Sequence, residues 1–433
     1  MKNKVTIAAA AALAAGALLL TGCSSGATSA SSAPLASAGA KKISGTVTFW
    51  DAYSSDSPEV STLEKVIIPA FEKLHPGVTV KDVAVPYNDL HQKLVTAVAG
   101  DQLPDLVRAD IIWVPELANL GVLEPLDTDM PDFKTLAGET YPGSLATNKW
   151  KGHYYGLPLD TNTRVMLYNQ QTLQNAGITA APTTLDQMMA DGAALKAKGD
   201  YVYADGGTSG WNVLPFIWSA GGDITNSGYT KATGYMNSPT TVKVVQEFVD
   251  MYKQGYIPNI VLGTPGGLGT EDGLAKGTYA SLLDGPWAFP ILQSQYPKFQ
   301  IQTAPVPSGA AGSVSVVGGE DVVLTKSSQN KDAAAEFMRY LLSPAAQLAM
   351  AKVGQMPVLS NLGSQLTTIQ SYYAPFQKQL KDAKPRPVTP AETQIDTILQ
   401  NEITSALKGQ ITVQKAMDSA ASQTDVLLAK YSK

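Results

Sequence analysis

The stretch 156–169 holds the residues most suited to chemistry, and it reads Gly-Leu-Pro-Leu-Asp-Thr-Asn-Thr-Arg-Val-Met-Leu-Tyr-Asn. Pro158 has no backbone donor and biases the residue before it toward an extended conformation. Five polar side chains follow at 160–164, and the short apolar run 165–168 is typical of a buried strand. Polar side chains between a proline-marked crossover and a buried strand can line a ligand cleft between two lobes. In the alternative interpretation, these polar residues only cap a turn at the entry of a strand.

A second group of candidate residues follows the expected strand 46–50. Trp50 ends this strand, and Asp51 and Tyr53 stand in the polar loop after it. Open α/β sheets bind ligands beside the carboxyl ends of their strands, so these three side chains are candidates for ligand contact. In the alternative interpretation, Trp50 belongs to the core and Asp51 caps a helix.

The elements that must position these residues alternate between strand and helix. The sequence predicts a helix at 60–74 despite Pro69, a strand at 78–85, a helix at 90–99 and a strand at 105–110. This alternation is typical of an α/β sandwich with parallel strands. With 433 residues, the chain is also longer than one hydrophobic core usually serves, which favours two lobes.

The pattern Tyr155-Gly-Leu-Pro…Leu167-Tyr168-Asn169 resembles the first lobe-to-lobe crossover of the extracellular solute-binding proteins that feed sugar ABC importers, the maltose-binding protein class. Further motifs occur in the order of that family, so the resemblance extends from about Gly45 to the C-terminus. These motifs are 104–107 (Pro-Asp-Leu-Val), 117–126, the strand and turn at 281–289, the second crossover at 316–324, the helix at 333–342, the turn at 354–358 and the proline-rich linker 384–390.

The resemblance implies an α/β fold of the two-lobed periplasmic-binding-protein type (type II). In this fold three crossovers form a hinge, and the ligand cleft lies between the lobes. The implied divisions are a lipoprotein signal peptide at 1–22, a flexible Ser/Ala/Gly tether at 23–42, an N-terminal lobe at 43–159 plus 321–373, and a C-terminal lobe at 160–320 plus 374–433.

Tryptophans are the most informative site residues that the resemblance implies. Trp211 matches the position of an aromatic residue that relatives use against the sugar, and Trp287 stands where a tryptophan stacks on a pyranose face. The C–H face of a sugar is apolar, and a large rigid ring covers it at little entropic cost. Trp218, inside an apolar run, is expected in the core. In the alternative interpretation, Trp287 also fills the core.

Charged and polar residues complete the candidate site. In relatives the residues that follow the motif at 104–107 contact ligand, which implies Arg108 and Asp110. The third crossover should bring Arg386 to the cleft, and in the alternative interpretation Arg386 is an exposed residue of the linker. Carboxylates accept and arginines donate the paired hydrogen bonds that sugar hydroxyls need. The complete ligand-binding set predicted from the sequence is Trp50, Asp51, Tyr53, Arg108, Asp110, Asp160, Asn162, Arg164, Trp211, Asp284, Trp287, Gly319, Glu320, Asp321 and Arg386.

One departure from the family pattern concerns the C-terminal lobe. Where maltose-binding protein has a further stacking tryptophan and tyrosine, this chain has Ile395 and Asp396. We therefore expect the ligand to be held differently from maltose.

The N-terminus resembles a bacterial lipoprotein signal. Lys2 and Lys4 precede an apolar, alanine-rich run at 5–20, and Leu-Thr-Gly-Cys ends at Cys23, the only cysteine of the chain. This implies lipidation of Cys23 and a location on the extracytoplasmic face of the cell membrane. The apolar run is shorter than the ~20 residues that a membrane span needs. The alternatives are an ordinary secretory leader with an incidental cysteine, or a membrane-spanning anchor.

Composition argues against several ligand classes. Charged residues make up 16% of the chain and the net charge is −5 at pH 7, whereas a phosphate-backbone ligand needs a basic face. The three histidines, His75, His91 and His153, are not spaced as metal ligands. The glycines at 206–210 fit neither the Walker A motif nor the dinucleotide fingerprint. We expect no cofactor, no metal and no nucleic-acid partner.

The resemblance implies a monomeric receptor, not an enzyme, that closes on a di- or oligosaccharide and delivers it to the transmembrane subunits of an ABC permease. Closure would be hinge motion across the three crossovers. Two other classes stay open. A secreted glycoside hydrolase would also place paired carboxylates among aromatic residues, about 5 to 9.5 Å apart. A metal or phosphate receptor could use a similar two-lobed frame.

Overall fold

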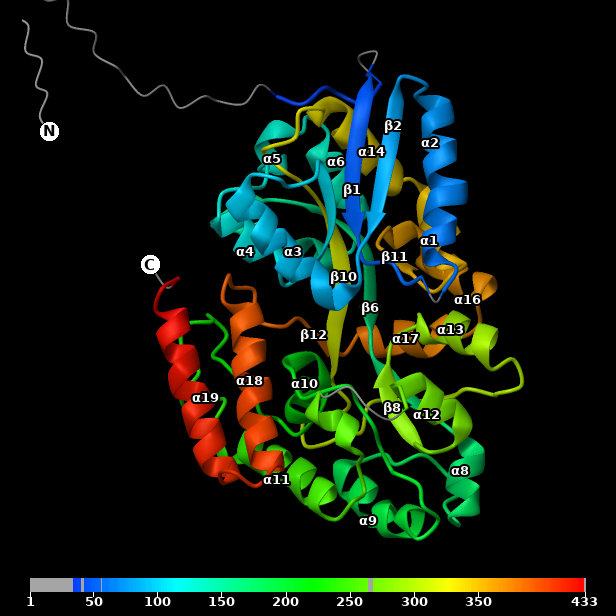
Figure 1. Cartoon of the computed structure of the whole chain (residues 1–433), viewed down its shortest axis with the longest axis vertical. Helices are drawn as coiled ribbons and strands as arrows, with labels where there is room; N and C mark the ends of the chain where they lie inside the picture. Colours follow the sequence, from blue (N-terminus) through cyan, green and yellow to red (C-terminus); the bar gives the residue numbers. More distant parts are fainter. Residues whose placement is uncertain (1–33, 40–42, 56, 264–267, 432–433) are drawn as a thin grey trace, which may run out of the picture. The chain divides into compact units, whose positions relative to one another are not determined.

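A seven-stranded sheet runs through the computed structural model, with strand order β11–β6–β10–β3–β1–β2 and β12 paired to β10 (Figure 1). The structure describes residues 34–39, 43–55, 57–263 and 268–431, so the signal peptide and Cys23 lie outside the described residues. The strands of this sheet are β1 (Gly45–Asp51), β2 (Val78–Ala84), β3 (Leu106–Asp110), β6 (Leu157–Thr163), β10 (Ser315–Leu324), β11 (Met356–Pro357) and β12 (Ala383–Lys384).

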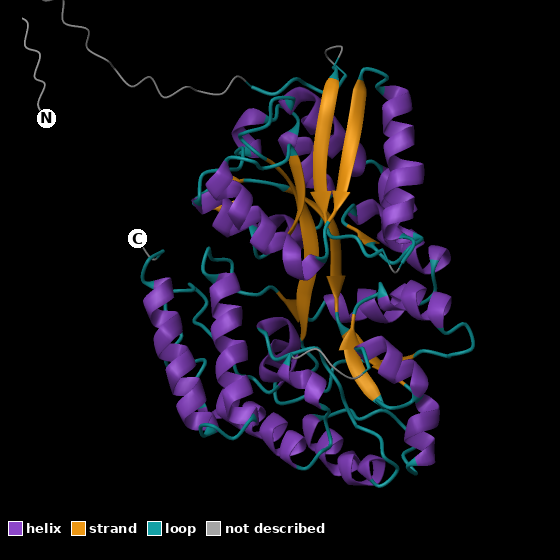
Figure 2. Ribbon diagram, in the orientation of Figure 1, coloured by secondary structure: helices purple, strands orange, loops and turns teal. Residues whose placement is uncertain are grey.

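A second, smaller sheet has the order β8–β7–β9, and two short strands form a separate pair (Figure 2). The strands of the small sheet are β7 (Val165–Tyr168), β8 (Ser281–Asp284) and β9 (Gln302–Ala304), and the separate pair is β4 (Lys149–Trp150) with β5 (His153–Tyr154).

Strand direction separates the two parts of the large sheet. β1 pairs in parallel with β2 and with β3, which confirms the parallel α/β arrangement predicted from the sequence. β10 runs antiparallel to both β3 and β6. The cores explain this direction: Val316 at the start of β10 packs in one hydrophobic cluster, and Val322 and Leu324 near its end pack in another. β10 therefore enters the sheet from the opposite lobe.

The N-terminal lobe is defined here by two hydrophobic clusters that cover the two faces of the large sheet. One contains Phe49, Phe71 and Phe337, and the other contains Leu94 and Trp113. The helices of this lobe are α1 (Glu59–Thr62), η1 (Leu63–Ile67), α2 (Ile68–Leu74), α3 (Tyr87–Gly100), α4 (Val114–Asn119), α5 (Leu126–Asp129), α6 (Phe133–Glu139), α7 (Pro142–Ala146), α14 (Lys331–Leu341) and α15 (Pro344–Ala351).

The C-terminal lobe is defined by the cluster that contains Phe216, Phe248 and Leu399. The helices in this cluster are α8 (Gln170–Asn175), α9 (Leu185–Lys196), α10 (Gly210–Ser219), α11 (Pro239–Lys253), η2 (Asn259–Leu262), α18 (Glu392–Leu407) and α19 (Val413–Leu428). The helices α12 (Thr270–Lys276) and α13 (Ala288–Gln295) pack in a separate cluster through residues such as Leu274 and Leu292.

The segment after α15 packs in a further cluster, in which Leu366 and Tyr373 accompany Leu282 and Leu292. Its helices are η3 (Ser360–Gln365), α16 (Leu366–Ile369) and α17 (Tyr373–Leu380). The lobe boundaries expected from the sequence stay a prediction.

The helix expected at 60–74 differs from the continuous α-helix of the prediction. It forms as α1, a π-helical turn η1 and α2, with Pro69 in the first turn of α2. A proline inside an α-helix lacks the N–H donor and clashes with the carbonyl four residues before it. A π-turn just ahead of the proline is one way to relieve that clash.

The tether expected at 23–42 is docked, not free, where the structure describes it. Leu35 is 5% exposed and packs in the core of the N-terminal lobe. The backbone of Ala36 accepts a hydrogen bond from Arg339 at 2.8 Å and donates one to Asp332 at 2.8 Å. This segment has the composition of a flexible linker. Burial of the apolar Leu35 side chain nevertheless stabilises its attachment to the N-terminal lobe.

Candidate functional site

Several polar residues of strands β3, β6 and β10 lie on one face of the large sheet, because side chains alternate along a strand with a period of two. Glu320 on β10 lies opposite Asp110 on β3 and opposite Asp160 on β6. Three carboxyl groups from three adjacent strands therefore lie in one row. The residues two positions along each strand from this row are Arg108, Asn162 and Gly318.

The first group on this face, which we name the hinge cluster, consists of Tyr53, Arg108, Asp160 and Glu320. The Arg108 guanidinium donates to Asp160 from Nε at 3.1 Å and from Nη2 at 2.9 Å, and Nη2 also donates to Glu320 at 2.7 Å. The Tyr53 ring lies 4.1 Å from the Arg108 guanidinium carbon. The Arg108 and Asp160 side chains are each only 4% exposed. Burial raises the pKa of Glu320, and the charge of Arg108 opposes that rise. The hinge cluster thus satisfies most of its hydrogen bonds internally.

Gly319 contributes backbone shape to this region. Its φ is +135°, and an added Cβ would lie 2.4 Å from the Asp160 carbonyl oxygen. Only glycine adopts this conformation without strain and lets β10 pass so close to β6.

The second group, which we name the aromatic cluster, consists of Arg164, Trp211, Trp287 and Arg386. The two tryptophan rings stack with centroids 6.3 Å apart and an angle of 28° between their planes. The guanidinium carbons of Arg164 and Arg386 lie 5.3 and 5.5 Å from the Trp211 ring centroid. Trp211 is in the first turn of α10, and Trp287 immediately precedes α13. Side chains from four segments therefore meet at Trp211.

Glycines make room for both rings. A Cβ on Gly318 would lie 2.7 Å from the Trp211 ring, and a Cβ on Gly285 would lie 2.1 Å from the Trp287 ring. A side chain at either position would displace the indole. The two glycines therefore belong to the site through the space that they leave.

Several polar groups of the aromatic cluster keep unused hydrogen-bonding capacity. Arg164 donates to the Trp211 carbonyl at 2.9 Å, to Asp205 at 2.9 Å and to the Leu283 carbonyl, but its Nε has no partner among the described residues. The Nε of Arg386 also has none there. Both arginine side chains are 4% exposed. Buried polar groups are nearly always satisfied, so unpartnered ones call for an explanation.

Asn162 adds an acceptor to these two donors. Its Oδ1 is likewise without a partner in the part of the chain that the structure describes. An added Cβ on Gly318 would touch both this oxygen and the Trp211 ring, so the amide lies beside the indole. Donors and an acceptor next to an aromatic face suit a ligand that carries hydroxyl groups.

Asp110 joins the two lobes. It accepts hydrogen bonds from the Tyr87 hydroxyl at 2.6 Å, from the Ile112 N–H at 2.9 Å and from Arg386 at 3.2 Å. Arg386 also lies 3.5 Å from Asp396 on α18. These ion pairs form a chain from Asp110 on β3 through Arg386 to Asp396 on α18, and this chain connects the N-terminal lobe to the C-terminal lobe.

Three residues of this region were missed in the sequence. Tyr87 is 44% exposed and stacks on Trp113 with centroids 5.4 Å apart. It follows Pro86 at the carboxyl end of β2, and that position was a usable signal. Asp205 holds Arg164, and Asp396 accepts a hydrogen bond from the Gly210 N–H at 2.9 Å.

Two predicted residues at the end of β1 lie apart from the aromatic cluster. The Trp50 ring is covered by the Lys93 ammonium at 4.0 Å. Asp51 is fully buried and accepts a hydrogen bond from the Tyr53 N–H at 2.8 Å. Burial, together with the neighbouring Asp51 carboxyl, raises the pKa of Asp82 to about 9.

Two further predicted carboxylates face protein groups. Asp284 accepts the N–H of Gly285 at 2.8 Å, and burial raises its pKa. Asp321 follows Glu320 on the strand, so its side chain takes the opposite face of the sheet. There it accepts hydrogen bonds from Asn148 at 2.7 Å and from Thr147 at 3.2 Å. Trp218 is 2% exposed in the core, as predicted.

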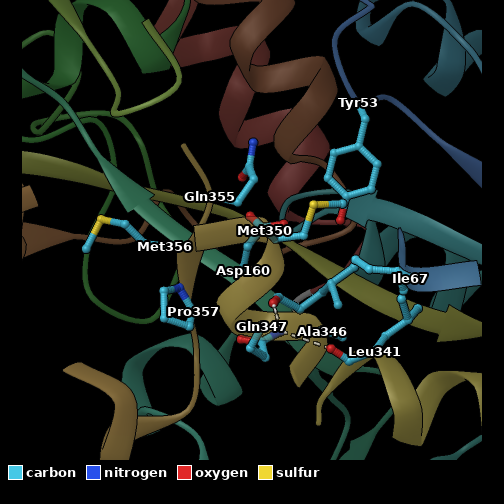
Figure 3. Close-up of a pocket in the computed structure, with 11 residues that line it drawn as sticks. Tyr53, Ile67, Asp160, Leu341, Ala346, Gln347, Met350, Gln355, Met356 and Pro357 are labelled. Atoms are coloured by element: carbon cyan, nitrogen blue, oxygen red, sulfur yellow. Dashed lines mark hydrogen bonds between the residues drawn. The ribbon is translucent and has the colours of Figure 1, made fainter. Parts of the chain in front are cut away.

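A small cavity lies next to two residues of the hinge cluster (Figure 3). Tyr53 and Asp160 line it together with apolar side chains such as Ile67 and Met350. The cavity measures about 10 Å³, which is room for about one water molecule. This cavity cannot hold a sugar.

Within the described ranges, no group of three or more His, Cys, Asp or Glu side chains is arranged to hold a metal ion. No helix in that same part of the chain is long and apolar enough to cross a membrane.

Comparison with known proteins agrees with this architecture. The multiple sugar-binding protein of Streptococcus mutans is 25% identical over 332 residues, which cover 71% of this chain and 74% of that protein. The sn-glycerol-3-phosphate-binding periplasmic protein UgpB of Yersinia enterocolitica is 27% identical over 318 residues, covering 66% of this chain and 69% of that protein.

Among solved structures, the GacH receptor of Streptomyces glaucescens, determined unliganded and in complex with acarbose, superposes with a TM-score of 0.81 at 24% identity. The match covers 90% of this chain and all (100%) of that one. The two-lobed α/β fold predicted from the sequence is thereby confirmed.

The family described as bacterial extracellular solute-binding protein has a model that matches residues 54–348. This match spans well over half of the chain and confirms the resemblance seen in the sequence motifs. The chain belongs to the bacterial extracellular solute-binding protein family.

Proposed function

We propose that this chain is the substrate-binding lipoprotein of an ABC importer, and that it captures a neutral di- or oligosaccharide at the aromatic cluster. The observation that carries the proposal is the Trp211–Trp287 stack beside unpartnered buried groups of Arg164, Arg386 and Asn162. An indole ring can cover the apolar face of a sugar, and the flanking groups can bind its hydroxyls.

The site composition favours a neutral ligand over a phosphate. One relative is named for sn-glycerol-3-phosphate, so a phosphorylated ligand is a fair alternative. Here, however, Arg386 is already paired with Asp110 and Asp396, and Arg164 with Asp205. A phosphate bound here would lie near at least as many carboxylates as guanidinium groups. The negative charges of the phosphate and of these carboxylates would repel each other.

Hydrolysis has no support from the geometry. Asp160 and Glu320, which lie opposite each other on β6 and β10, both accept hydrogen bonds from Arg108. A glycosidase acid needs a free carboxylic acid at the scissile bond. We therefore propose binding without turnover.

Calorimetric titration of the mature protein with a panel of neutral di- and trisaccharides tests the ligand class. We expect saturable binding of at least one sugar with one site per chain, unchanged in EDTA, and no shorter products after long incubation. Glycerol 3-phosphate is the comparison ligand. Tight binding of the phosphate with no response to any sugar would overturn the proposal.

Membrane attachment through Cys23 belongs to the same proposal. A lipid on this residue would keep the protein on the extracytoplasmic face, close to the permease subunits. Its test is Cys23→Ala, which should release the protein from the membrane fraction into the medium or periplasm. Retention of the variant in the membrane would show that another feature anchors the chain.

A further inference from the structure

Asp396 touches both sides of the aromatic cluster without being part of it. One carboxylate oxygen, Oδ1, accepts a hydrogen bond from the Gly210 N–H at 2.9 Å, and the other, Oδ2, lies 3.5 Å from Nη1 of Arg386. The two partners belong to different segments. Gly210 begins α10, one residue before Trp211, and Arg386 lies in the linker before α18.

The contact with Gly210 supplies what α10 lacks at its start. The N-cap residue Ser209 makes no side-chain capping bond to this helix, and the first turn contains no acidic residue. The first N–H groups of a helix need partners, and a negative charge there is stabilising. Asp396, 186 residues away in sequence, provides both. An added Cβ on Gly210 would lie 2.5 Å from the Asp396 carboxylate. A side chain at position 210 would therefore displace this carboxylate.

Two more contacts fix the same turn of α10. Arg164 donates to the Trp211 carbonyl at 2.9 Å, and Asp205 accepts a hydrogen bond from the Asn212 amide at 2.5 Å. Asp396 differs from Asp205 in one respect. Through Arg386 it is also connected to Asp110, which lies in the other lobe.

We propose that Asp396 is a positioning residue that fixes Trp211 and Arg386 relative to each other and ties both to the N-terminal lobe. The inference rests on the proposed function, because it assigns Asp396 a role in sugar binding without direct contact to the sugar. Contacts from Asp110 through Arg386 and Asp396 to the first turn of α10 would transmit the approach of the lobes to the Trp211 ring. Asp396 thereby determines where the aromatic face stands when the lobes meet.

Two substitutions separate the two contacts. Asp396→Asn keeps an oxygen for the Gly210 N–H and removes the charge that holds Arg386, whereas Asp396→Ala removes both. We expect amide exchange at the start of α10, measured without ligand, to be near wild type in Asp396→Asn and faster in Asp396→Ala. Sugar affinity should fall in both, by at least about tenfold in Asp396→Ala, as for loss of a hydrogen bond to a charged group.

The matched control is Asp186→Asn, which removes one negative charge from an exposed position in the first turn of α9. It should leave both exchange at α10 and sugar affinity unchanged. A double-mutant cycle with Arg386→Gln supplies the readout that a purely structural role would not give: the affinity losses of Asp396→Asn and Arg386→Gln should be less than additive.

The amide-exchange arm needs no ligand, so it remains decisive even if no sugar in the panel binds. Wild-type exchange at the start of α10 in Asp396→Ala would overturn the positioning role. Fully additive affinity losses in the cycle would overturn the link through Arg386. If Asp396→Ala does not fold, Asp396→Asn and the cycle still decide the matter.

Discussion

The hinge cluster and the aromatic cluster both contain arginine and aromatic side chains in contact with carboxylates, but they differ in how completely their hydrogen bonds are satisfied. In the hinge cluster, Arg108 places its donors on Asp160 and Glu320 while Tyr53 covers its face. In the aromatic cluster, two buried arginines each keep an Nε without a partner among the residues described. A satisfied network fixes geometry, and an unsatisfied one leaves capacity for a ligand. Residue type alone therefore does not distinguish a hinge from a binding surface.

The largest effect should come from breaking the hinge cluster. Arg108→Ala leaves two buried carboxylates without their cation, and removing one partner of a buried ion pair typically costs about 3 to 5 kcal/mol of the free energy of unfolding. Urea unfolding of the wild type and the variant measures this loss. The matched control is Lys243→Ala on α11, whose side chain is 73% exposed and pairs with Glu247 at 3.4 Å, and it should cost less than about 1 kcal/mol. A variant of Arg108 with wild-type stability but much weaker sugar binding would contradict the assignment of this residue to the hinge.

The next largest effect should be on binding, at the aromatic cluster. Trp287→Ala removes a stacked ring and should weaken sugar binding by about 2 to 4 kcal/mol, as for an aromatic hot spot. Its free energy of unfolding should fall by less than the ~3 to 5 kcal/mol typical of a deleted core tryptophan. Ligand-induced change in tryptophan fluorescence should shrink as well.

Trp218→Phe provides the opposite case. Trp218 is buried, and its indole N–H donates to Asp223 at 2.9 Å. This variant should lose stability and keep its affinity for sugar. If Trp287→Ala behaved in the same way, Trp287 would be a core residue, and the ligand site would have to be sought around Trp211 and Trp50.

The positions of these clusters show what the sequence could predict. The motifs identified the crossovers, and the alternation Arg108-Ala-Asp110 and Asp160-Thr-Asn162 was enough to put these side chains on one strand face. The same alternation separates Glu320 from Asp321, which was included among the ligand residues but lies with Asn148 on the other face. Spacing within a strand is thus readable from the sequence.

Contacts between distant segments were not readable in this way. Tyr87 meets Asp110 across 23 positions, and Asp396 meets Gly210 across 186. Neither contact follows from a local pattern, because both depend on how the helices dock on the sheet. The docking of Leu35 was missed for the same reason, since its neighbours have the composition of a free linker.

The last effect depends on pH and should come from the Asp82 carboxyl on β2, next to Asp51. Burial and the adjacent Asp51 raise the pKa of Asp82 to about 9, whereas the pKa of an aspartate in an unfolded chain is about 4. The folded state binds the Asp82 proton more tightly than the unfolded state does. The stability that this proton contributes is fully present below about pH 4 and is lost as the pH rises toward about 9. Asp82→Asn stays neutral throughout. Its Tm should match the wild type at about pH 4 and exceed it by a margin that grows as the pH rises toward about 9, with sugar affinity unchanged.

Thermal melts of both proteins across this pH range check the sign. A Tm advantage for Asp82→Asn that grows toward acid would contradict the raised pKa of Asp82. The comparison also tests whether the N-terminal lobe can gain stability without any change at the aromatic cluster.

The most direct test of the division between the two clusters is a crystal structure of the protein with a bound di- or trisaccharide. The account predicts that a sugar ring lies against Trp211 or Trp287 and accepts hydrogen bonds from Arg164 or Arg386. It also predicts that Arg108 stays paired with Asp160 and Glu320. A sugar bound to Arg108 in place of those carboxylates, with both tryptophans untouched, would contradict it.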